Sequence, residues 1–277
     1  MKILKYILVS FFIALTGCAL SPKNAETSNS SDSLLSKQFD DINFQIKEKP
    51  ANEKIYVFLG SAQHSQSTAF MNDILLAKST LLSINPKFKS IILSNEIQSG
   101  SLRYPFATRE NLNKTFDYLS EISKNHRLTL FTLISTHGNV DLLTVNIANK
   151  YYNPIYSKDI KKWYNNLSPN TIKTILISSC YSGSFVDPLI NTNSIILTAS
   201  ASNRNSFGCN PTDKNTFFIQ ELFNKDLDVN SNWVTNFINT EKKIALLEKQ
   251  MNLSPPSNPQ IYVPNEFKDL TIYQLLN

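Results

Sequence analysis

The sequence contains few of the residues from which proteins build cross-links and metal sites. Only three of its 277 residues are cysteine, three are histidine and two are tryptophan. The histidines are scattered, and neither they nor the cysteines show the spacing of metal ligands. We therefore expect no bound metal, and nothing in the sequence indicates an organic cofactor.

The charge of the chain is weakly positive and is not concentrated. There are 27 basic and 22 acidic side chains, a formal net charge of +5, and Lys2 and Lys5 contribute part of this excess. No basic stripe is present, so nucleic acid is not an expected partner. With 42% hydrophobic residues the chain can bury a sizeable core, and a single domain is the simplest arrangement.

The first eighteen residues have the composition of a secretory signal. A short basic start precedes an apolar run at 6–15, which is about half the roughly 20 residues that a membrane-spanning helix requires. The letters LTGC that end at Cys18 resemble the lipobox of bacterial lipoproteins. This resemblance implies that 1–17 are removed, that Cys18 carries a diacylglycerol, and, because Ala19 follows, that the protein sits in the outer membrane of a Gram-negative cell envelope. An ordinary signal peptide and a buried apolar helix remain the alternatives.

Residues 18–50 differ in composition from the rest of the chain. They are rich in Ser, Asn, Lys and Asp and show no sustained apolar period. We interpret them as the lipidated cysteine and a tether, flexible up to about Leu34, that lifts the protein off a membrane surface. The remaining residues, 51–277, are then one globular domain.

Within this domain, short apolar runs alternate with amphipathic segments. The runs predict strands at 54–60, 89–94, 127–135, 171–179 and 194–200. Apolar residues at helical spacing predict helices over 70–81, from Thr108 to Ile122, near 157–167 and over 230–252. Residues 142–148 read as part of a hairpin. This alternation predicts an α/β fold with a mostly parallel sheet and helices on both faces.

Two of the predicted strands run directly into residues that can do chemistry. The strand at 127–135 leads into His137 and Gly138, and the strand at 171–179 leads into Cys180. If the two strands are parallel neighbours, an imidazole and a thiol emerge side by side at the edge where such sheets bind ligands. That arrangement is a Cys/His dyad, in which the thiolate attacks and the histidine moves the proton.

Each of these signals is weak when taken alone, because a cysteine at the end of a strand is most often a small buried hydrophobe. Their combination predicts a nucleophile, Cys180, and a base, His137, with the N–H groups of Gly138 and Cys180 as the oxyanion hole. Gly183 would also allow the backbone to approach a substrate. A permanent disulfide would abolish such a site, so we expect Cys180 and Cys209 to be free.

The two motifs resemble those of the legumain-like cysteine peptidases, peptidase family C13, whose clan includes the caspases. The matching segments are LISTHG at 133–138 and SSCYSGS at 178–184, flanked by YPFATRENL at 104–112, ILTASASNRNSFGC at 196–209 and SPPSNPQIYV at 254–263.

The resemblance covers 54–263 and implies a caspase-like three-layer sandwich with His137 and Cys180 catalytic. It further implies that Ser206 lines the substrate pocket, and we add three neighbouring hydroxyl residues as pocket candidates, Ser178, Thr198 and Ser200.

The sequence also departs from the eukaryotic legumain pattern. The loop GSAQHSQST at 60–68 has no arginine where legumains place one for a substrate Asn or Asp side chain. His64 and Gln66 are the candidates to take its place, and the alternative for His64 is an exposed loop histidine without function. Arg204 could contact a substrate carboxylate, or be an ordinary loop arginine.

The function expected from the sequence is hydrolysis of peptide bonds through a thioester at Cys180, on a peptide or protein substrate, with Asn and Asp as the candidate residues before the scissile bond. Two alternatives stay open. One is transamidation on the same dyad, and the other is a catalytically silent binding module held at the membrane through lipidated Cys18.

Overall fold

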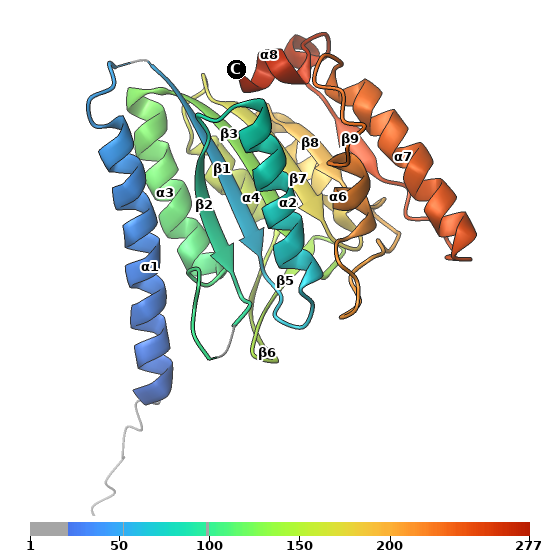
Figure 1. Ribbon diagram of the computed structural model, residues 1–277, viewed down its shortest axis with the longest axis horizontal. Coiled ribbons are helices and arrows are strands. Elements are labelled where there is room, and N and C mark those ends of the chain that lie inside the picture. Colours follow the sequence, from blue (N-terminus) through green and yellow to red (C-terminus); the bar gives the residue numbers. More distant parts are fainter. Residues whose placement is uncertain (1–21, 52, 98–99) are drawn as a thin grey trace, which may run out of the picture.

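A computed structural model describes residues 22–51, 53–97 and 100–277 of the chain (Figure 1). Its centre is a six-stranded sheet in the order β2-β1-β3-β7-β8-β9. The strands are β1 (Lys54–Ala62), β2 (Lys89–Ser94), β3 (Arg127–Ser135), β7 (Ile172–Ser178), β8 (Ile195–Thr198) and β9 (Gln260–Tyr262). The first five are parallel, whereas β9 runs antiparallel to β8. The predicted parallel sheet is confirmed, and β3 and β7 are indeed neighbours.

Helices cover both faces of this sheet. The α-helices are α1 (Pro22–Ile46), α2 (Ala69–Ile84), α3 (Arg109–Asn125), α4 (Ser157–Asn165), α5 (Val186–Leu189), α6 (Phe217–Leu222), α7 (Trp233–Gln250) and α8 (Ile272–Leu276). Short 3₁₀ turns are η1 (Ser182–Phe185), η2 (Ile190–Thr192) and η3 (Asn265–Phe267). The chain therefore has the α/β three-layer architecture that the alternation of its segments predicts.

The two faces of the sheet carry separate apolar cores because successive strand residues point in opposite directions. Val57 belongs to the core that the sheet shares with α1, α3 and α4. The next residue, Phe58, belongs to the core that the sheet shares with α2, α6, α7 and α8. Both side chains are fully buried. Strands buried on both faces read as continuous apolar runs, which is why the sequence shows them so clearly.

A small second sheet follows His137 in the chain. It consists of β4 (Gly138–Asn139), β5 (Leu142–Ile147) and β6 (Lys150–Ile155). The turn between β5 and β6 is formed by Ala148 and Asn149, both with positive φ, as a tight hairpin connection requires. The predicted hairpin is confirmed. It lies against the loop after β1, where the Asn146 N–H donates to the Gln63 carbonyl at 2.8 Å.

The prediction of a tether over 18–50 is wrong where the structure describes this stretch, because most of it forms α1. Four apolar side chains recur at helical spacing and face the core, namely Leu35, Phe39, Ile42 and Ile46. The polar letters between them conceal this stripe. The Phe39 ring also stacks on Tyr118 of α3 with centroids 4.1 Å apart. The second half of α1 is thus part of the domain.

The predicted signal peptide and Cys18 lie outside the described residues. Within the described ranges, no helix is long and apolar enough to cross a membrane. No group of three or more His, Cys, Asp or Glu side chains gathers there in a way that could hold a metal ion.

Candidate active site

The register of β3 and β7 places His137 and Cys180 at equivalent positions. Ser135 is paired with Ser178, and each candidate catalytic residue follows its serine by two positions. The Thr136 N–H donates to the Ser178 carbonyl at 3.1 Å, so the two chains stay joined beyond the last strand residues. Neighbouring strands lie about 4.8 Å apart. The imidazole and the thiol therefore leave the same edge of the sheet from adjacent strands.

The sulfur of Cys180 lies against Ser206, the residue expected to line the substrate pocket. The Ser206 N–H points at Sγ from 3.4 Å, and its hydroxyl is 3.8 Å from Sγ. The thiol in turn lies 3.6 Å from the Ser206 carbonyl. Ser206 is 8% exposed, so it forms a wall at the base of the site.

The glycines of both motifs are sites of close backbone contact. A Cβ on Gly138 would lie 2.8 Å from both the Cys180 carbonyl and the Ser179 hydroxyl. A Cβ on Gly183 would lie 2.6 Å from the Ser202 nitrogen. Such distances are too short for any side chain, so the strand-end loops are pressed together. Gly138 therefore brings the main chain after His137 directly onto the main chain of Cys180.

The ring of His137 is enclosed by two other rings. The His64 ring meets it edge to face with centroids 4.5 Å apart, and the Phe70 ring does so at 5.0 Å. Burial lowers the pKa of His137 below the ordinary value of 6.5. The imidazole is therefore neutral near pH 7, which is the form that a general base requires.

His64 is buried, with 2% of its surface exposed, so the reading of it as an exposed loop residue is wrong. The hairpin covers His64. Asn146 of β5 forms a β-bridge with His64, and its side-chain oxygen accepts a hydrogen bond from the Ser65 hydroxyl at 2.8 Å. Burial lowers the pKa of His64 to about 4, and the charge of His137 acts in the same direction. Its Nε2 has no hydrogen-bond partner among the described residues.

A buried carboxyl group lies beneath the two strand ends. Asp73 of α2 accepts hydrogen bonds from the Ser135 hydroxyl at 2.7 Å, the Thr216 hydroxyl at 2.8 Å and the Thr216 N–H at 3.0 Å. Asn215 donates to it at 3.1 Å, and Thr216 also contacts the Ser178 hydroxyl at 2.9 Å. Burial raises the pKa of Asp73 to about 7, and these hydrogen bonds oppose that rise. The network joins α2, β3, β7 and the start of α6.

Our sequence analysis missed Asp73, although the signal was present. It stands three residues after Phe70 and one before Ile74, on the apolar face of the predicted helix. An acidic residue on such a face is unusual, because a buried charge needs partners to offset its lost hydration. Here Ser135 at the end of β3 and two residues of the loop before α6, Asn215 and Thr216, supply them.

Three further pocket candidates support the site from below and do not line it. Ser178, Thr198 and Ser200 have no exposed surface. The Thr198 hydroxyl donates to the Ser200 carbonyl at 3.2 Å, and the Ser200 hydroxyl accepts from the Ser182 N–H at 3.1 Å. The prediction that they contact substrate is corrected, because Ser178 and Thr198 are the last residues of β7 and β8, Ser200 lies just beyond β8, and all three are fully buried.

The second cysteine of the described residues, Cys209, is unlike Cys180 in its surroundings. Cys180 and Cys209 are both free thiols in the structure. Burial raises the pKa of Cys209 to about 11, and the nearby Cys180 adds to the rise. Cys209 is therefore protonated and unreactive near neutral pH.

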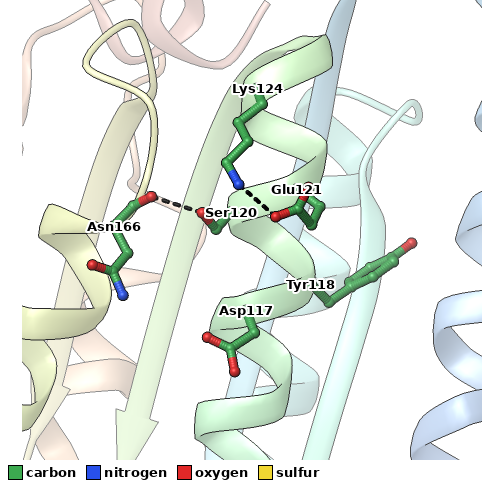
Figure 2. A pocket seen from close by; sticks show the side chains of 6 residues that line it. All are labelled: Asp117, Tyr118, Ser120, Glu121, Lys124 and Asn166. Carbon is green, nitrogen blue, oxygen red and sulfur yellow. Dashed lines mark hydrogen bonds and ion pairs between the residues drawn. The ribbon is translucent and has the colours of Figure 1, made fainter.

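A surface hollow on α3 lies apart from this site (Figure 2). It is lined by Asp117, Tyr118, Ser120, Glu121, Lys124 and Asn166. Lys124 pairs with Glu121 at 2.5 Å, and the Ser120 hydroxyl donates to the Asn166 carbonyl at 2.7 Å. The hollow contains neither His137 nor Cys180.

Comparison with known proteins points to the family that the two sequence motifs resemble. The model of the Peptidase C13 family matches residues 120–252, slightly less than half of the chain, and this stretch contains both His137 and Cys180. No curated protein matches the sequence.

Two solved structures resemble the fold. Caspase-1 from Spodoptera frugiperda aligns with a TM-score of 0.54 and 15% identity over 77% of this chain and 87% of its own. Protein GSU0716 from Geobacter sulfurreducens aligns with a TM-score of 0.52 and 11% identity over 81% of this chain and all of its own. At these identities the likeness concerns the fold, which is caspase-like.

Proposed function

We propose that this chain is a cysteine peptidase of the C13 family, with Cys180 as nucleophile and His137 as general base. The observation that carries the proposal is the equal offset of these residues beyond the paired Ser135 and Ser178. The family match over both motifs and the caspase-like fold support it. Asp73 and its partners act as positioning groups, because they hold the two strand ends that present the dyad.

The reaction follows from the chemistry of the two side chains. His137 takes the proton of the thiol, and the sulfur of Cys180 attacks the peptide carbonyl carbon, whose oxygen becomes an oxyanion. The N–H groups of Gly138 and Cys180 stabilise this oxyanion. His137 then donates its proton to the leaving amine as the C–N bond breaks. Water, deprotonated by His137, hydrolyses the remaining thioester and releases the acid and the thiol.

Arg204 and Ser206 are the residues we assign to substrate selection. The Tyr181 N–H donates to the Arg204 carbonyl at 2.8 Å, which ties this arginine to the residue after the nucleophile. A guanidinium suits both an Asp carboxylate and an Asn amide oxygen. We propose cleavage after Asn or Asp, with Arg204 in the role that legumains give to an arginine in another loop.

The test is a cleavage profile of the protein against a mixed peptide library, under reducing conditions and over a range of pH, read by mass spectrometry. We expect cuts that cluster after Asn or Asp and that disappear in Cys180→Ala. Cys209→Ala is the matched control and should retain them. Equal cleavage by Cys180→Ala, or no cleavage at any pH, would overturn the proposal. Adducts with an added amine would instead identify a transamidase.

We also propose that the protein is a lipoprotein anchored in the outer membrane through Cys18. The proposal rests on the basic start, the short apolar run and the letters LTGC. Mass spectrometry of the protein isolated from membranes tests it. We expect a diacylglycerol on an N-terminal Cys18 in the parent and an unprocessed, non-acylated chain in Cys18→Ala.

A further inference from the structure

The direction of α1 relative to the sheet is fixed by contacts along the helix. Ile46, at its end, lies beside Lys54 and Lys89, the first residues of β1 and β2. The side chain of Gln38 bonds both main-chain groups of Ile92 in the middle of β2, at 2.7 and 3.0 Å. The helix therefore runs antiparallel to the strands, and its N-terminal half points towards their carboxyl ends.

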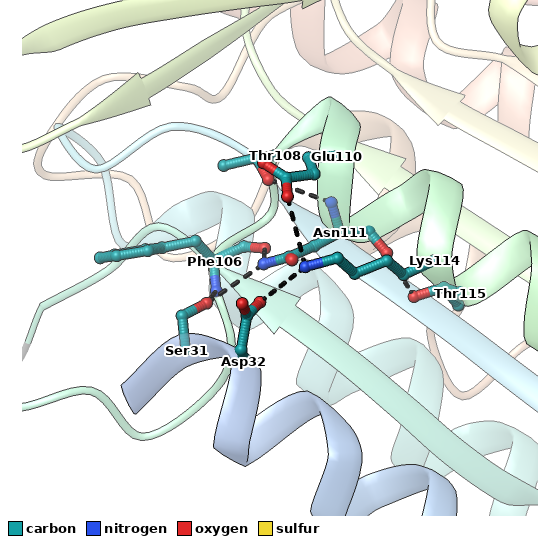
Figure 3. Close-up of polar contacts among 8 residues, drawn as sticks. All are labelled: Ser31, Asp32, Phe106, Thr108, Glu110, Asn111, Lys114 and Thr115. Atoms are coloured by element: carbon teal, nitrogen blue, oxygen red, sulfur yellow. Dashed lines mark hydrogen bonds and ion pairs between the residues drawn. The ribbon is translucent and has the colours of Figure 1, made fainter. Parts of the chain in front are cut away.

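A group of polar contacts joins the N-terminal half of α1 to α3 and to the segment before it (Figure 3). The Ser31 hydroxyl accepts from the Phe106 N–H at 2.9 Å and from the Asn111 side chain at 3.1 Å. Pro105, next to Phe106, accepts from the Ser94 N–H at the end of β2. One residue later, Asp32 pairs with Lys114 of α3 at 2.9 Å. Ser31 thus marks where α1 passes the carboxyl edge of the sheet.

Beyond Ser31 the helix continues back to Pro22, which lies past this edge by about 13 Å at 1.5 Å per residue. Cys18 stands four residues before Pro22, a span of at most about 14 Å. A lipid on Cys18 is therefore within about 30 Å of the edge that carries His137 and Cys180. The edge formed by the amino ends of the strands is farther from Cys18 by the length of β3, about 30 Å for its nine residues.

The same end of the molecule carries the exposed part of the hairpin (Figure 1). Tyr151 and Tyr152 are 64% and 43% exposed, and Val140 is 58% exposed. The ammonium of Lys150 lies 5.5 Å from the Tyr152 ring centre. Tyrosine and lysine are the side chains that suit the headgroup region of a bilayer, where an apolar body meets a polar surface.

From these observations we infer that the catalytic edge faces the bilayer to which the protein is anchored. Its substrates are then polypeptide segments close to that membrane, within about ten residues of their own anchor, since an extended chain spans about 3.4 Å per residue. The inference rests on the proposed peptidase activity and on the lipid on Cys18. Beyond those two proposals, it specifies which substrates can reach the dyad.

The orientation can be measured without using activity. The full-length lipidated protein is placed in vesicles of phosphatidylethanolamine and phosphatidylglycerol that contain a dansyl-headgroup lipid. Energy transfer from tryptophan to the dansyl group is compared for two variants at exposed positions, Val140→Trp on the catalytic edge and Tyr273→Trp on α8. α8 lies beside the amino end of β1, because the carbonyl of Asn277, just after α8, accepts a hydrogen bond from Lys54. The parent corrects for the two native tryptophans.

We expect clearly greater transfer from Val140→Trp than from Tyr273→Trp. Equal transfer, or greater transfer from Tyr273→Trp, would overturn the inference, and so would the absence of a lipid on Cys18. Because no cleavage is involved, this result is independent of whether the chain is a peptidase.

The substrate arm uses one cleavable sequence fused to a membrane anchor through a spacer of about eight or about forty residues. We expect the parent to prefer the short spacer several-fold. A long Gly/Ser insertion between Leu20 and Ser21 should abolish that preference, because it frees the domain to turn. If the parent cleaves neither the anchored substrates nor the same sequence as a soluble peptide, the result counts against the peptidase activity. Intact soluble cleavage with no spacer preference would count against the membrane-facing edge.

Discussion

The imidazole rings of His64 and His137 meet edge to face, with centroids 4.5 Å apart and an interplanar angle of 86°. His64 comes from the loop after β1 and His137 from the end of β3, so the contact joins neighbouring strands. His64 shields one side of His137, the proposed base, from water. This burial is the physical cause of the lowered pKa of His137.

The pH dependence of the reaction follows from that shielding. kcat/KM should fall on the acid side as His137 becomes protonated, and since its pKa is lowered, this limb should lie below pH 6.5. His64→Ala admits water, so we expect the limb to move to higher pH. His64→Phe keeps the ring and should leave the limb near its place. A pH–rate profile in which both variants behave alike would contradict this role of His64.

A second prediction concerns the two free thiols. A thiolate paired with an imidazole reacts quickly with iodoacetamide, whereas a buried thiol with a raised pKa reacts slowly. Cys180 should therefore be alkylated quickly near pH 7 while Cys209, with a pKa of about 11, is spared. The rate should drop at least tenfold in His137→Ala and stay unchanged in Cys209→Ala. Peptide mapping after timed alkylation gives both rates, and preferential labelling of Cys209 would refute the assignment.

The close approach at Gly138 gives a third prediction. In Gly138→Ala the new methyl group would meet the Cys180 carbonyl and the Ser179 hydroxyl at 2.8 Å. The nucleophile loop must then shift, and displaced oxyanion donors cost about 10² to 10³ in kcat. Gly100→Ala is the control, since its methyl group meets nothing within 4 Å although its φ is positive. Full kcat in folded Gly138→Ala, checked by circular dichroism, would contradict the proposed oxyanion hole.

Asp73 leads to a prediction about stability. Its pKa rises from 3.8 in the unfolded chain to about 7 in the folded protein. The folded state therefore holds an extra proton between these values, and stability should fall as pH rises from about 4 to 7, by up to about 4 kcal/mol. Asp73→Asn cannot titrate and should lack this part of the slope. Urea unfolding of both proteins at several pH values measures it, and parallel pH profiles would show that Asp73 keeps its ordinary pKa.

The placement of His137 and Cys180 beyond the ends of neighbouring strands could be predicted from the sequence because it depends on short-range patterns. The strands that lead to His137 and Cys180 are rich in apolar residues, and each candidate residue follows two positions after the end of its strand. The surroundings of the dyad could not be predicted in the same way. The burial of His64 depends on a hairpin that begins 78 residues later in the chain, at Leu142, which no local pattern in the loop after β1 reveals.

Among the elements that escaped prediction, β9 and α1 did so for different reasons. β9 has only three residues, too few for a strand pattern, and it forms because the chain after α7 returns to pair with β8. α1 has a recognisable apolar stripe, but only in its second half, from Leu35 onwards. The polar first half determined our interpretation of the whole stretch as a tether.

The packing of α1 yields the last prediction, and the helix supplies its own control. Ile42 is 3% exposed, whereas Phe44, two residues on, is 83% exposed. Ile42→Ala leaves a cavity in the core and should cost about 2 to 4 kcal/mol of unfolding free energy. Phe44→Ala removes a larger side chain from the surface and should change it by less than about 0.5 kcal/mol. Urea unfolding of both variants decides the matter. If neither variant differs from the parent, α1 does not belong to the domain, and its direction would no longer place the catalytic edge towards the membrane.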